Sequence, residues 1–314
     1  MKAETVANQL INQSTLYHVP VLFSEVLQEL NIQPNGVYVD CTFGGGGHSK
    51  GILEKLDDTG KLIAFDQDAD AVKNIPNDKR VTFVPHNFRH LQRFLKLHKI
   101  VKVNGILADL GVSSHQFDEG ERGFSIRFDG PFDMRMDQRQ NLTAAMVVAT
   151  YSELQLHKIF EKFGEVSNSK TLAKHSVETR KQMQVQTILQ FKVMISSVVK
   201  GNPNKYLAQV FQALRIEVNT EMETLKEMLL QLNDVVEKGG RAAIITFHSL
   251  EDRLVKTFFK NGNFDDVEDD NPFVQTVKQQ QWKLITKKPI MATSDELKRN
   301  NRSRSAKLRV AEKM

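Results

Sequence analysis

The feature that most constrains the fold is an alternation of short apolar segments with amphipathic ones in the first third of the chain. The segments 36–42, 61–66, 81–86 and 104–111 are expected to form strands, and 49–56, 69–74 and 90–98 are expected to form helices between them. Continuous apolar strands separated by helices are typical of a parallel sheet covered on both faces. The sequence therefore predicts an α/β fold with a Rossmann-like sheet.

This pattern stops after residue 114 and returns near residue 240. Residues 115–141 are polar and are expected to form a loop, and the apolar spacing from 142 to about 236 predicts helices. A strand at 240–248, a helix at 249–260 and strands at 281–288 and 305–312 follow. We therefore predict a discontinuous domain, 1–114 and 216–314, that is interrupted by a mostly helical insertion at 115–215.

Composition limits the class of protein. Hydrophobic residues make up 40% and charged residues 26% of the 314 residues, as in globular proteins, and the apolar runs are too short to span a bilayer. The lone Cys41 excludes an intrachain disulfide, and residues 1–14 lack a signal-peptide pattern. We expect a cytoplasmic protein without a membrane partner. The net charge of +5, concentrated in segment 283–309, is compatible with a polyanionic partner.

A glycine-rich segment, Gly44 to Gly47, connects the first predicted strand to the first helix. Glycines permit a tight turn and a close approach of the backbone to a ligand at the start of a helix. The dinucleotide fingerprint is incomplete and the P-loop motif is absent. Asp66, at the end of the second strand, can accept hydrogen bonds from ribose hydroxyls. Because S-adenosylmethionine has a ribose but no pyrophosphate, the pattern favours this cofactor over NAD, with a simple tight turn as the alternative.

Asp109 ends the fourth predicted strand, where open α/β sheets bind their ligands. Methyltransferases that act on amino groups place Asp or Asn there, usually before two prolines and an aromatic residue. Leu110 and Gly111 follow here, so this motif is only partly present. Methylation of a pyrimidine at carbon 5 needs a thiolate, and Cys41 is expected to pack in the first strand. The sequence thus favours methylation of nitrogen or oxygen, with Asp109 as the candidate catalytic residue.

Several longer motifs resemble one protein family. The segments 109–114, 121–125 and 133–137 are similar to those of the bacterial 16S ribosomal RNA cytosine-N4 methyltransferases, the RsmH (MraW) family, and so are 18–22, 46–49, 211–216, 247–253 and 301–309. The sequence departs from the family pattern at 126–132, 163–169 and 205–210, and the stretch 261–280 is shorter than in the family. The resemblance therefore extends over nearly the whole chain, and most of its departures lie in or beside the predicted insertion.

The resemblance implies that S-adenosylmethionine donates a methyl group to the N4 amine of a decoding-centre cytidine in 16S ribosomal RNA of the small ribosomal subunit. It implies cofactor contacts at Gly46, Gly47, His48, Asp66, Phe88, Asp109 and Gln116. Because the sulfonium of this cofactor is already a strong electrophile, we expect no metal. Two rival functions stay open, a methyltransferase for nitrogen or oxygen of small molecules and a non-catalytic ribosome-assembly factor. The oligomeric state is left open between monomer and homodimer.

Basic residues provide candidates for RNA binding. Segment 121–135 interleaves arginines, including Arg122 and Arg135, with phenylalanines, which suits an extruded base and its phosphates. The alternative is a loop that its phenylalanines hold against the protein. Arg302 and Arg304 are candidates for phosphate contacts, with a solvated strand edge as the alternative. His248, after the fifth main strand, either contacts the base as a second catalytic candidate or stabilises the start of the following helix.

Overall fold

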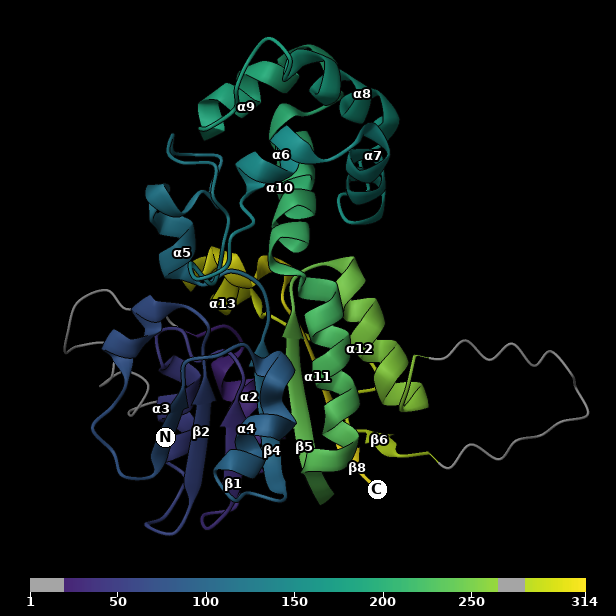
Figure 1. Ribbon diagram of the computed structural model, residues 1–314. Helices are drawn as coiled ribbons and strands as arrows, with labels where there is room; N and C mark the ends of the chain where they lie inside the picture. The colour runs from purple at the N-terminus through teal and green to yellow at the C-terminus, as the bar shows by residue number, and fades with distance from the viewer. Residues whose placement is uncertain (1–19, 265–279) are drawn as a thin grey trace, which may run out of the picture.

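The computed structural model describes residues 20–264 and 280–314, so the N-terminal segment 1–14 lies outside the described residues. Its centre is one eight-stranded sheet in the order β3-β2-β1-β4-β5-β8-β6, with β7 paired to β8 (Figure 1). The strands are β1 Val37–Asp40, β2 Lys61–Phe65, β3 Val81–Val84, β4 Val103–Asp109, β5 Val236–Thr246, β6 Trp282–Leu284, β7 Ile290–Met291 and β8 Lys307–Lys313. The first five are parallel, and β8 runs antiparallel to β5. The predicted α/β fold is confirmed.

The side chains of each strand alternate between two buried layers. Val39 and Ile106 lie in a core beneath α4, α11 and α12, whereas Tyr38 and Leu107 lie in a core beneath α2 and α3. These helices are α2 Phe23–Glu29, α3 Gly47–Leu53, α4 Leu91–Leu97, α11 Glu221–Val235 and α12 Ser249–Asn261. Burial on both faces explains why the strands are apolar throughout. Each fully buried large side chain contributes about 1.5–3 kcal/mol to folding.

The strand order creates a ligand crevice at a defined place. The chain runs from β1 outward to β2 and β3, and then β4 returns to pair with the other side of β1. The connections after β1 and β4 therefore leave the sheet in opposite directions, and open sheets bind ligands at such a point, beyond the carboxyl ends of the strands. Asp40 and Asp109 are the last residues of these two strands.

The helices that follow β4 stand beyond this edge of the sheet, at the top of Figure 1. They are α5 Ser114–Asp118, α6 Ala144–Thr150, α7 Glu153–Lys162, α8 Ser169–Thr179, α9 Ile188–Ile195 and α10 Pro203–Asn219. Short 3-10 helices lie at η1 Ala69–Asn74, η2 Phe88–His90, η3 Gly120–Arg122, η4 Ser196–Val198 and η5 Asn301–Ser305. The predicted domain boundary at 215/216 falls inside α10 and stays a prediction. No helix within the described ranges has both the length and the apolarity needed to cross a bilayer.

Two local predictions were wrong, and one helix was missed. Residues 115–141 were expected to be a loop, yet α5 forms because Ser113 and Gln116 make a capping box at its start. The strand expected at 281–288 is only β6 and is followed by β7. Helix α13 Ser294–Arg299 was not predicted, although Thr293 caps its first turn.

Candidate active site

Side chains and main chain join the ends of β1 and β4. The buried Asp40 carboxylate accepts hydrogen bonds from the Thr42 N–H at 3.0 Å and from the Ser49 hydroxyl at 2.7 Å. The Thr42 hydroxyl in turn accepts a hydrogen bond from the Asp109 N–H at 2.7 Å. These contacts fix the position of Asp109 relative to the glycine loop.

The glycine loop needs glycine for two different reasons. Gly44 and Gly46 have positive φ angles of 51° and 74°, a region that other residues rarely adopt. A Cβ on Gly47 would lie 2.3 Å from Pro20 Cγ, and one on Gly46 would lie 2.9 Å from Phe43 Cζ. The loop ends at the first turn of α3, with Gly46 as N-cap. The loop is therefore a tight backbone turn, and Pro20 and Phe43 leave no room for a side chain at Gly47 and Gly46.

Asp66 faces this loop from the end of β2. Its carboxylate accepts hydrogen bonds from the N–H groups of Gly44, at 2.7 Å, and of Asp68, at 2.8 Å. Burial raises the pKa of Asp66 to about 6, although these two N–H groups lower it. The side chain is therefore mainly ionised at neutral pH. Because a carboxylate has about four acceptor positions, two remain for hydroxyl groups of a ligand.

Asp109 has the most unusual environment of the predicted site residues. Its side chain keeps 24% of its exposure, but its Oδ1 atom is buried and has no hydrogen-bond partner among the described residues. Burial, together with the negative charges of Asp40 and Glu251, raises the pKa of Asp109 to about 8. An unpartnered acceptor in a crevice, with a pKa raised this far, is typical of a functional residue.

His48 lies beside Asp109, with 3.8 Å between its Nδ1 and the Asp109 Oδ2. Its Nε2 donates a hydrogen bond to the Val21 carbonyl at 3.0 Å. Burial lowers the pKa of His48 to about 4, which the bond to Val21 partly offsets, so the ring is neutral at pH 7. The lone pair of Nδ1 is therefore on the side of Asp109.

Helix α5 and the adjoining η3 attach to the loop after β2 through Asp68. Gln116 Nε2 donates to the Asp68 carboxylate at 2.6 Å, and Arg122 pairs with the same oxygen at 2.8 Å. Arg122 also donates to the carbonyls of Arg135 and Met136. We expected Arg122 to contact RNA, but its side chain is only 7% exposed. Its position instead suits a residue that holds the segment after β4 onto the Asp66 loop.

Phe88 reaches the same region from the loop after β3. Its neighbour Asn87 donates from Nδ2 to the Gln67 Oε1 at 2.7 Å, which joins the loops after β2 and β3. Phe88 itself is half-buried. The predicted cofactor residues therefore lie on the loops and helix starts that follow β1, β2, β3 and β4.

For the segment 121–135 we expected either residues that are accessible to RNA or phenylalanines that hold the loop against the protein. The part between η3 and α6 has features of both. Phe124 and Phe132 are buried and hold it against the protein, whereas Phe128 is 42% exposed. Arg135 pairs with Asp133 at 2.7 Å and donates to main-chain carbonyls nearby, so much of its guanidinium is already engaged.

The two candidates in η5 differ in their contacts. Arg302 binds both oxygens of the Asp118 carboxylate, at 2.6 and 2.7 Å, whereas Arg304 is exposed.

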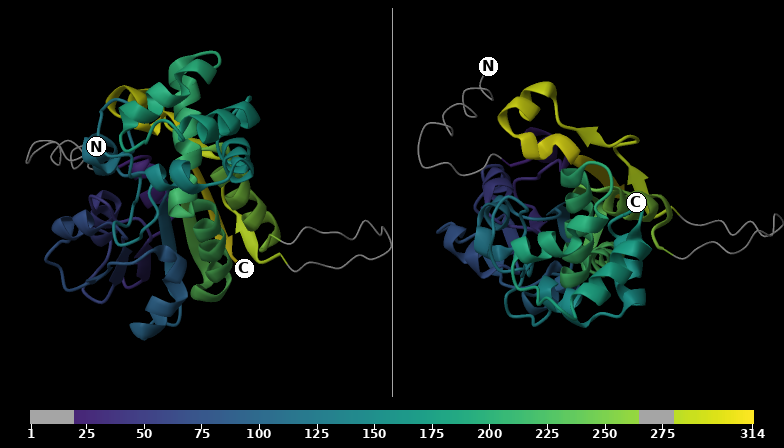
Figure 2. Two further views of the ribbon diagram at one scale, coloured as in Figure 1. Left: turned by 45° about the horizontal axis from the view of Figure 1, so that its top comes forward. Right: turned by 90° about the horizontal axis from the view of Figure 1, so that it is seen from above.

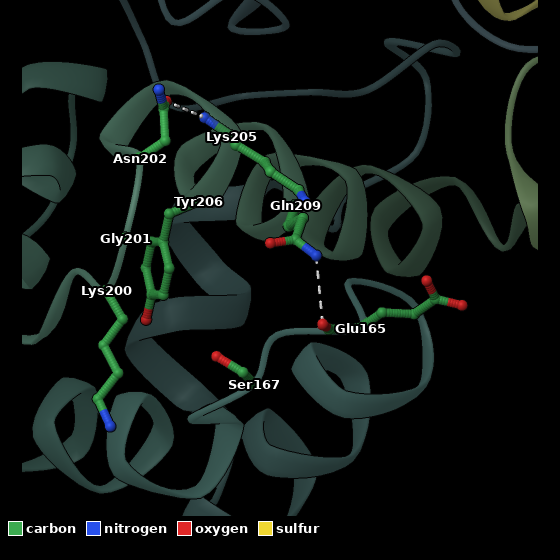
Figure 3. A pocket seen from close by; sticks show the side chains of 8 residues that line it. All are labelled: Glu165, Ser167, Lys200, Gly201, Asn202, Lys205, Tyr206 and Gln209. Atoms are coloured by element: carbon green, nitrogen blue, oxygen red, sulfur yellow. Dashed lines mark hydrogen bonds between the residues drawn. The ribbon is translucent and has the colours of Figure 1, made fainter.

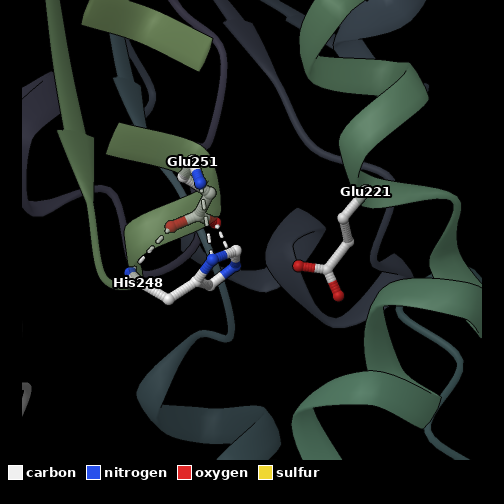
Figure 4. Close-up of side chains that lie close together, drawn as sticks. All are labelled: Glu221, His248 and Glu251. Carbon is white, nitrogen blue, oxygen red and sulfur yellow. Dashed lines mark hydrogen bonds and ion pairs between the residues drawn. The ribbon is translucent and has the colours of Figure 1, made fainter. Parts of the chain in front are cut away.

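His248 lies at the N-cap of α12, near Glu251 and Glu221 (Figure 4). Its Nδ1 accepts from the Glu251 N–H at 3.4 Å, so the neutral ring carries its proton on Nε2 and offers no lone pair there. Both oxygens of Glu221 accept hydrogen bonds from Arg215, at 2.9 and 3.0 Å. These contacts favour a helix cap over a metal site.

A separate hollow of about 300 Å³ lies among the helices that follow β4 (Figure 3). It is lined by Glu165, Ser167, Lys200, Gly201, Asn202, Lys205, Tyr206 and Gln209. No predicted site residue lines it. The hollow joins the segments 163–169 and 205–210, in which the sequence departs from the family pattern.

Sequence reasoning missed Asp40, Asp68 and Glu251. A signal for Asp40 was available, since it ends an apolar strand as Asp66 and Asp109 do. Asp68 lies two residues after Asp66, but its partners Gln116 and Arg122 are far away in the sequence. Local patterns therefore gave no sign of its role.

Comparison with known proteins identifies the family. The sequence profile of the MraW methylase family matches residues 15–314. The chain belongs to the MraW methylase family. A protein of Bacteroides fragilis named Ribosomal RNA small subunit methyltransferase H is 52% identical over 302 residues, which cover 96% of this chain and 99% of that protein. Proteins of the same name from Phocaeicola vulgatus and Flavobacterium johnsoniae are 53% and 50% identical, each over 95% of this chain and 98% of their own length. The resemblance found in the sequence is confirmed.

Proposed function

We propose that this chain transfers a methyl group from S-adenosylmethionine to the N4 amine of a decoding-centre cytidine in 16S ribosomal RNA. The observation that carries the proposal is the partly exposed carboxylate of Asp109 at the end of β4 in a MraW-family methylase, with an Oδ1 that has no partner among the described residues. The substrate class is supported by the relatives named Ribosomal RNA small subunit methyltransferase H. Such a substrate assigns the reaction to the cytoplasm and to the small ribosomal subunit.

The residues of the crevice fit the cofactor. Asp66 has two acceptor positions left for ribose hydroxyls, and the loop from Gly44 to Gly47 faces it as a tight turn at the start of α3. Phe88 offers a half-buried aromatic face beside the same loops. When bound, S-adenosylmethionine supplies an electrophilic methyl group on its sulfonium. We assign Gly46, Gly47, His48, Asp66 and Phe88 to holding it, with Gln116 supporting the pocket through Asp68.

Asp109 acts on the substrate amine in this proposal. An exocyclic amine conjugated to a ring is a poor nucleophile, and an acceptor for its N–H fixes its orientation and can take the proton. The Asp109 carboxylate is such an acceptor, since its side chain is partly exposed and its Oδ1 has no hydrogen-bond partner among the described residues. Thr42 and Asp40 hold the main chain of Asp109 in place. General-base assistance of this kind typically contributes about 10²–10⁴-fold to rate.

The remaining predicted residues receive supporting roles. We assign residues 115–215 to recognition of RNA, and Arg122 to fixing the position of this region relative to the cofactor loops. We assign His248 to capping the N-terminus of α12, without a part in the reaction itself. Arg135, Arg302 and Arg304 stay candidates for RNA contacts.

Labelled S-adenosylmethionine tests the function against its two rivals. We would incubate the protein with small ribosomal subunits that lack the modification, with protein-free 16S ribosomal RNA and with free cytidine. The proposal predicts label in RNA and none in the free nucleoside. Label in cytidine alone would support a small-molecule methyltransferase, and RNA binding without label would support an assembly factor.

A further inference from the structure

Two arginines from distant parts of the chain gather on one end of α5. Arg127 follows η3, and Arg302 lies in η5 near the C-terminal end. Both contact Phe117 and Asp118, the last two residues of α5. The part of the chain around α13 and η5, yellow in Figures 1 and 2, lies beside α5, as the contact between Arg302 and Asp118 requires.

The guanidinium groups lie over aromatic rings. The Arg127 guanidinium carbon is 5.2 Å from the centre of the Phe117 ring and 5.7 Å from that of Phe128, and the Arg302 carbon is 5.8 Å from the Phe117 ring. This is the distance range of cation–π contacts. We call the four residues Phe117, Arg127, Phe128 and Arg302 the arginine–phenylalanine surface.

This surface has an excess of positive charge. Asp118 is the shared partner, at 2.6 Å from Arg302 and 3.5 Å from Arg127, so one carboxylate faces two guanidiniums. Arg304, two residues beyond Arg302, is exposed as well. Ion pairs this exposed contribute only about 0–1 kcal/mol to stability. The arrangement is therefore poorly explained by stabilisation of the fold.

The surface also has the groups that bind unpaired nucleotides. Arg127 is 58% exposed and Phe128 is 42% exposed, so a planar cation and an aromatic ring are accessible side by side. Single-stranded nucleic acids bind by stacking bases on aromatic rings and guanidinium planes, and by pairing phosphates with basic side chains.

The position of the arginine–phenylalanine surface on α5 connects it to the candidate active site. Helix α5 begins just after the loop that follows Asp109, and Gln116, next to Phe117, bonds to Asp68 of the Asp66 loop. A strand of RNA on this surface would therefore run beside the crevice. We propose that the arginine–phenylalanine surface binds the unpaired RNA segment that flanks the target nucleotide. This inference rests on the proposed function and adds the residues that grip the substrate.

Binding of RNA as a function of salt tests the inference. We would measure the affinity of Arg127→Ala, Phe128→Ala, Arg302→Ala and Asp118→Asn for protein-free 16S ribosomal RNA and for small subunits. Arg93→Ala, which removes an exposed charge from α4, is the matched control. Melting temperature and affinity for S-adenosylmethionine verify that each variant is folded with its cofactor site intact.

The four variants should change the affinity for RNA and its salt dependence in different ways. Arg127→Ala and Arg302→Ala should lower affinity about tenfold and reduce the slope of log affinity against log salt by about 0.7 for each lost phosphate contact. Phe128→Ala should lower affinity about tenfold, within the range of a lost base stack, with the slope unchanged. Asp118→Asn, which removes the competing carboxylate, should tighten binding a few-fold. Arg93→Ala should behave as wild type.

Three results would overturn the inference. If the Arg127, Phe128 and Arg302 variants bind RNA like wild type, the surface does not hold it, although the proposed function stands. If they bind subunits weakly but protein-free RNA normally, the partner is a ribosomal protein. If the wild type itself binds neither substrate, the proposed function fails together with the inference.

Discussion

The glycine loop at residues 44–47 and the arginine-rich segment 121–135 both lie near the crevice, but they are built differently. The loop depends on backbone conformation, with positive φ at Gly44 and Gly46, and on the close packing of its backbone against Phe43 and Pro20. The segment depends on side-chain pairs with distant residues, such as Arg122 with Asp68. The role of the loop therefore follows from residue type, whereas the role of each arginine follows from its partner.

The largest expected effect is at Asp109, whose N–H bonds to Thr42 just before the glycine loop. Asp109→Ala should lower kcat for methyl transfer about 10²–10⁴-fold, because the substrate amine loses its acceptor. Affinity for S-adenosylmethionine, measured by calorimetry, separates this role from a role in cofactor binding. A drop in affinity that accounts for the whole loss of rate would show that Asp109 only holds the cofactor.

The pH dependence follows from the raised pKa of Asp109. Since the acceptor must be ionised, kcat/KM should rise with pH and level off above about 8. Asp109→Asn should remove this limb of the profile.

The free energy of unfolding should fall as pH rises, which is opposite to the trend of the activity. Between about pH 4 and 8 the folded protein keeps a proton on Asp109 that the unfolded chain releases. The melting temperature of Asp109→Asn should therefore gain on the wild type as pH rises through this window, and an unchanged difference would contradict the assignment.

Substitution of glycine gives the next largest effect. Gly46→Ala combines a left-handed backbone, which costs about 1–2 kcal/mol, with a contact of 2.9 Å to Phe43. It should weaken cofactor binding at least tenfold. Gly239→Ala is a matched control, since Gly239 has a φ of 83° and open space around it. Equal losses of cofactor affinity in the two variants would mean that the loop acts through general stability alone.

Substitutions of Arg122 and Arg135 test which side-chain pairs hold the segment 121–135 in place. Arg122→Ala leaves Asp68 buried without its charge partner, which typically costs about 3–5 kcal/mol of unfolding free energy. Arg135→Ala removes a partly exposed local pair with Asp133 and should cost about 1 kcal/mol or less. Denaturant unfolding measures both values, and the salt dependence of RNA binding should be unchanged by Arg122→Gln, which removes the charge. A reduced salt slope in Arg122→Gln would show that Arg122 contacts RNA phosphates.

The smallest effect is expected at His248. Asparagine is also a good N-cap, so His248→Asn should keep the cap of α12 and change kcat less than about threefold. His248→Ala should lose about 1 kcal/mol of stability. A large loss of kcat in His248→Asn, with unchanged melting temperature, would make this histidine catalytic.

The sequence was sufficient to predict the strands and the candidate acids whose pattern lies within a short stretch of the chain. The strands up to Asp109 were found because each is apolar throughout, and the site acids Asp66 and Asp109 because each ends such a strand. The buried position of Arg122 was not predictable, since only the fold brings Asp68 to it. The gathering of Arg127 and Arg302 on Phe117 likewise depends on the packing of the C-terminal segment against α5. Long-range pairs of side chains account for most of what was missed.

The most direct test of the central claim is nucleoside analysis of 16S ribosomal RNA after reaction of unmodified small subunits with labelled S-adenosylmethionine. The account predicts label in N4-methylcytidine with the wild-type protein and its loss with Asp109→Ala, while both proteins bind the cofactor. Label at carbon 5 or on a ribose oxygen, or no label in RNA despite measured cofactor binding, would contradict it.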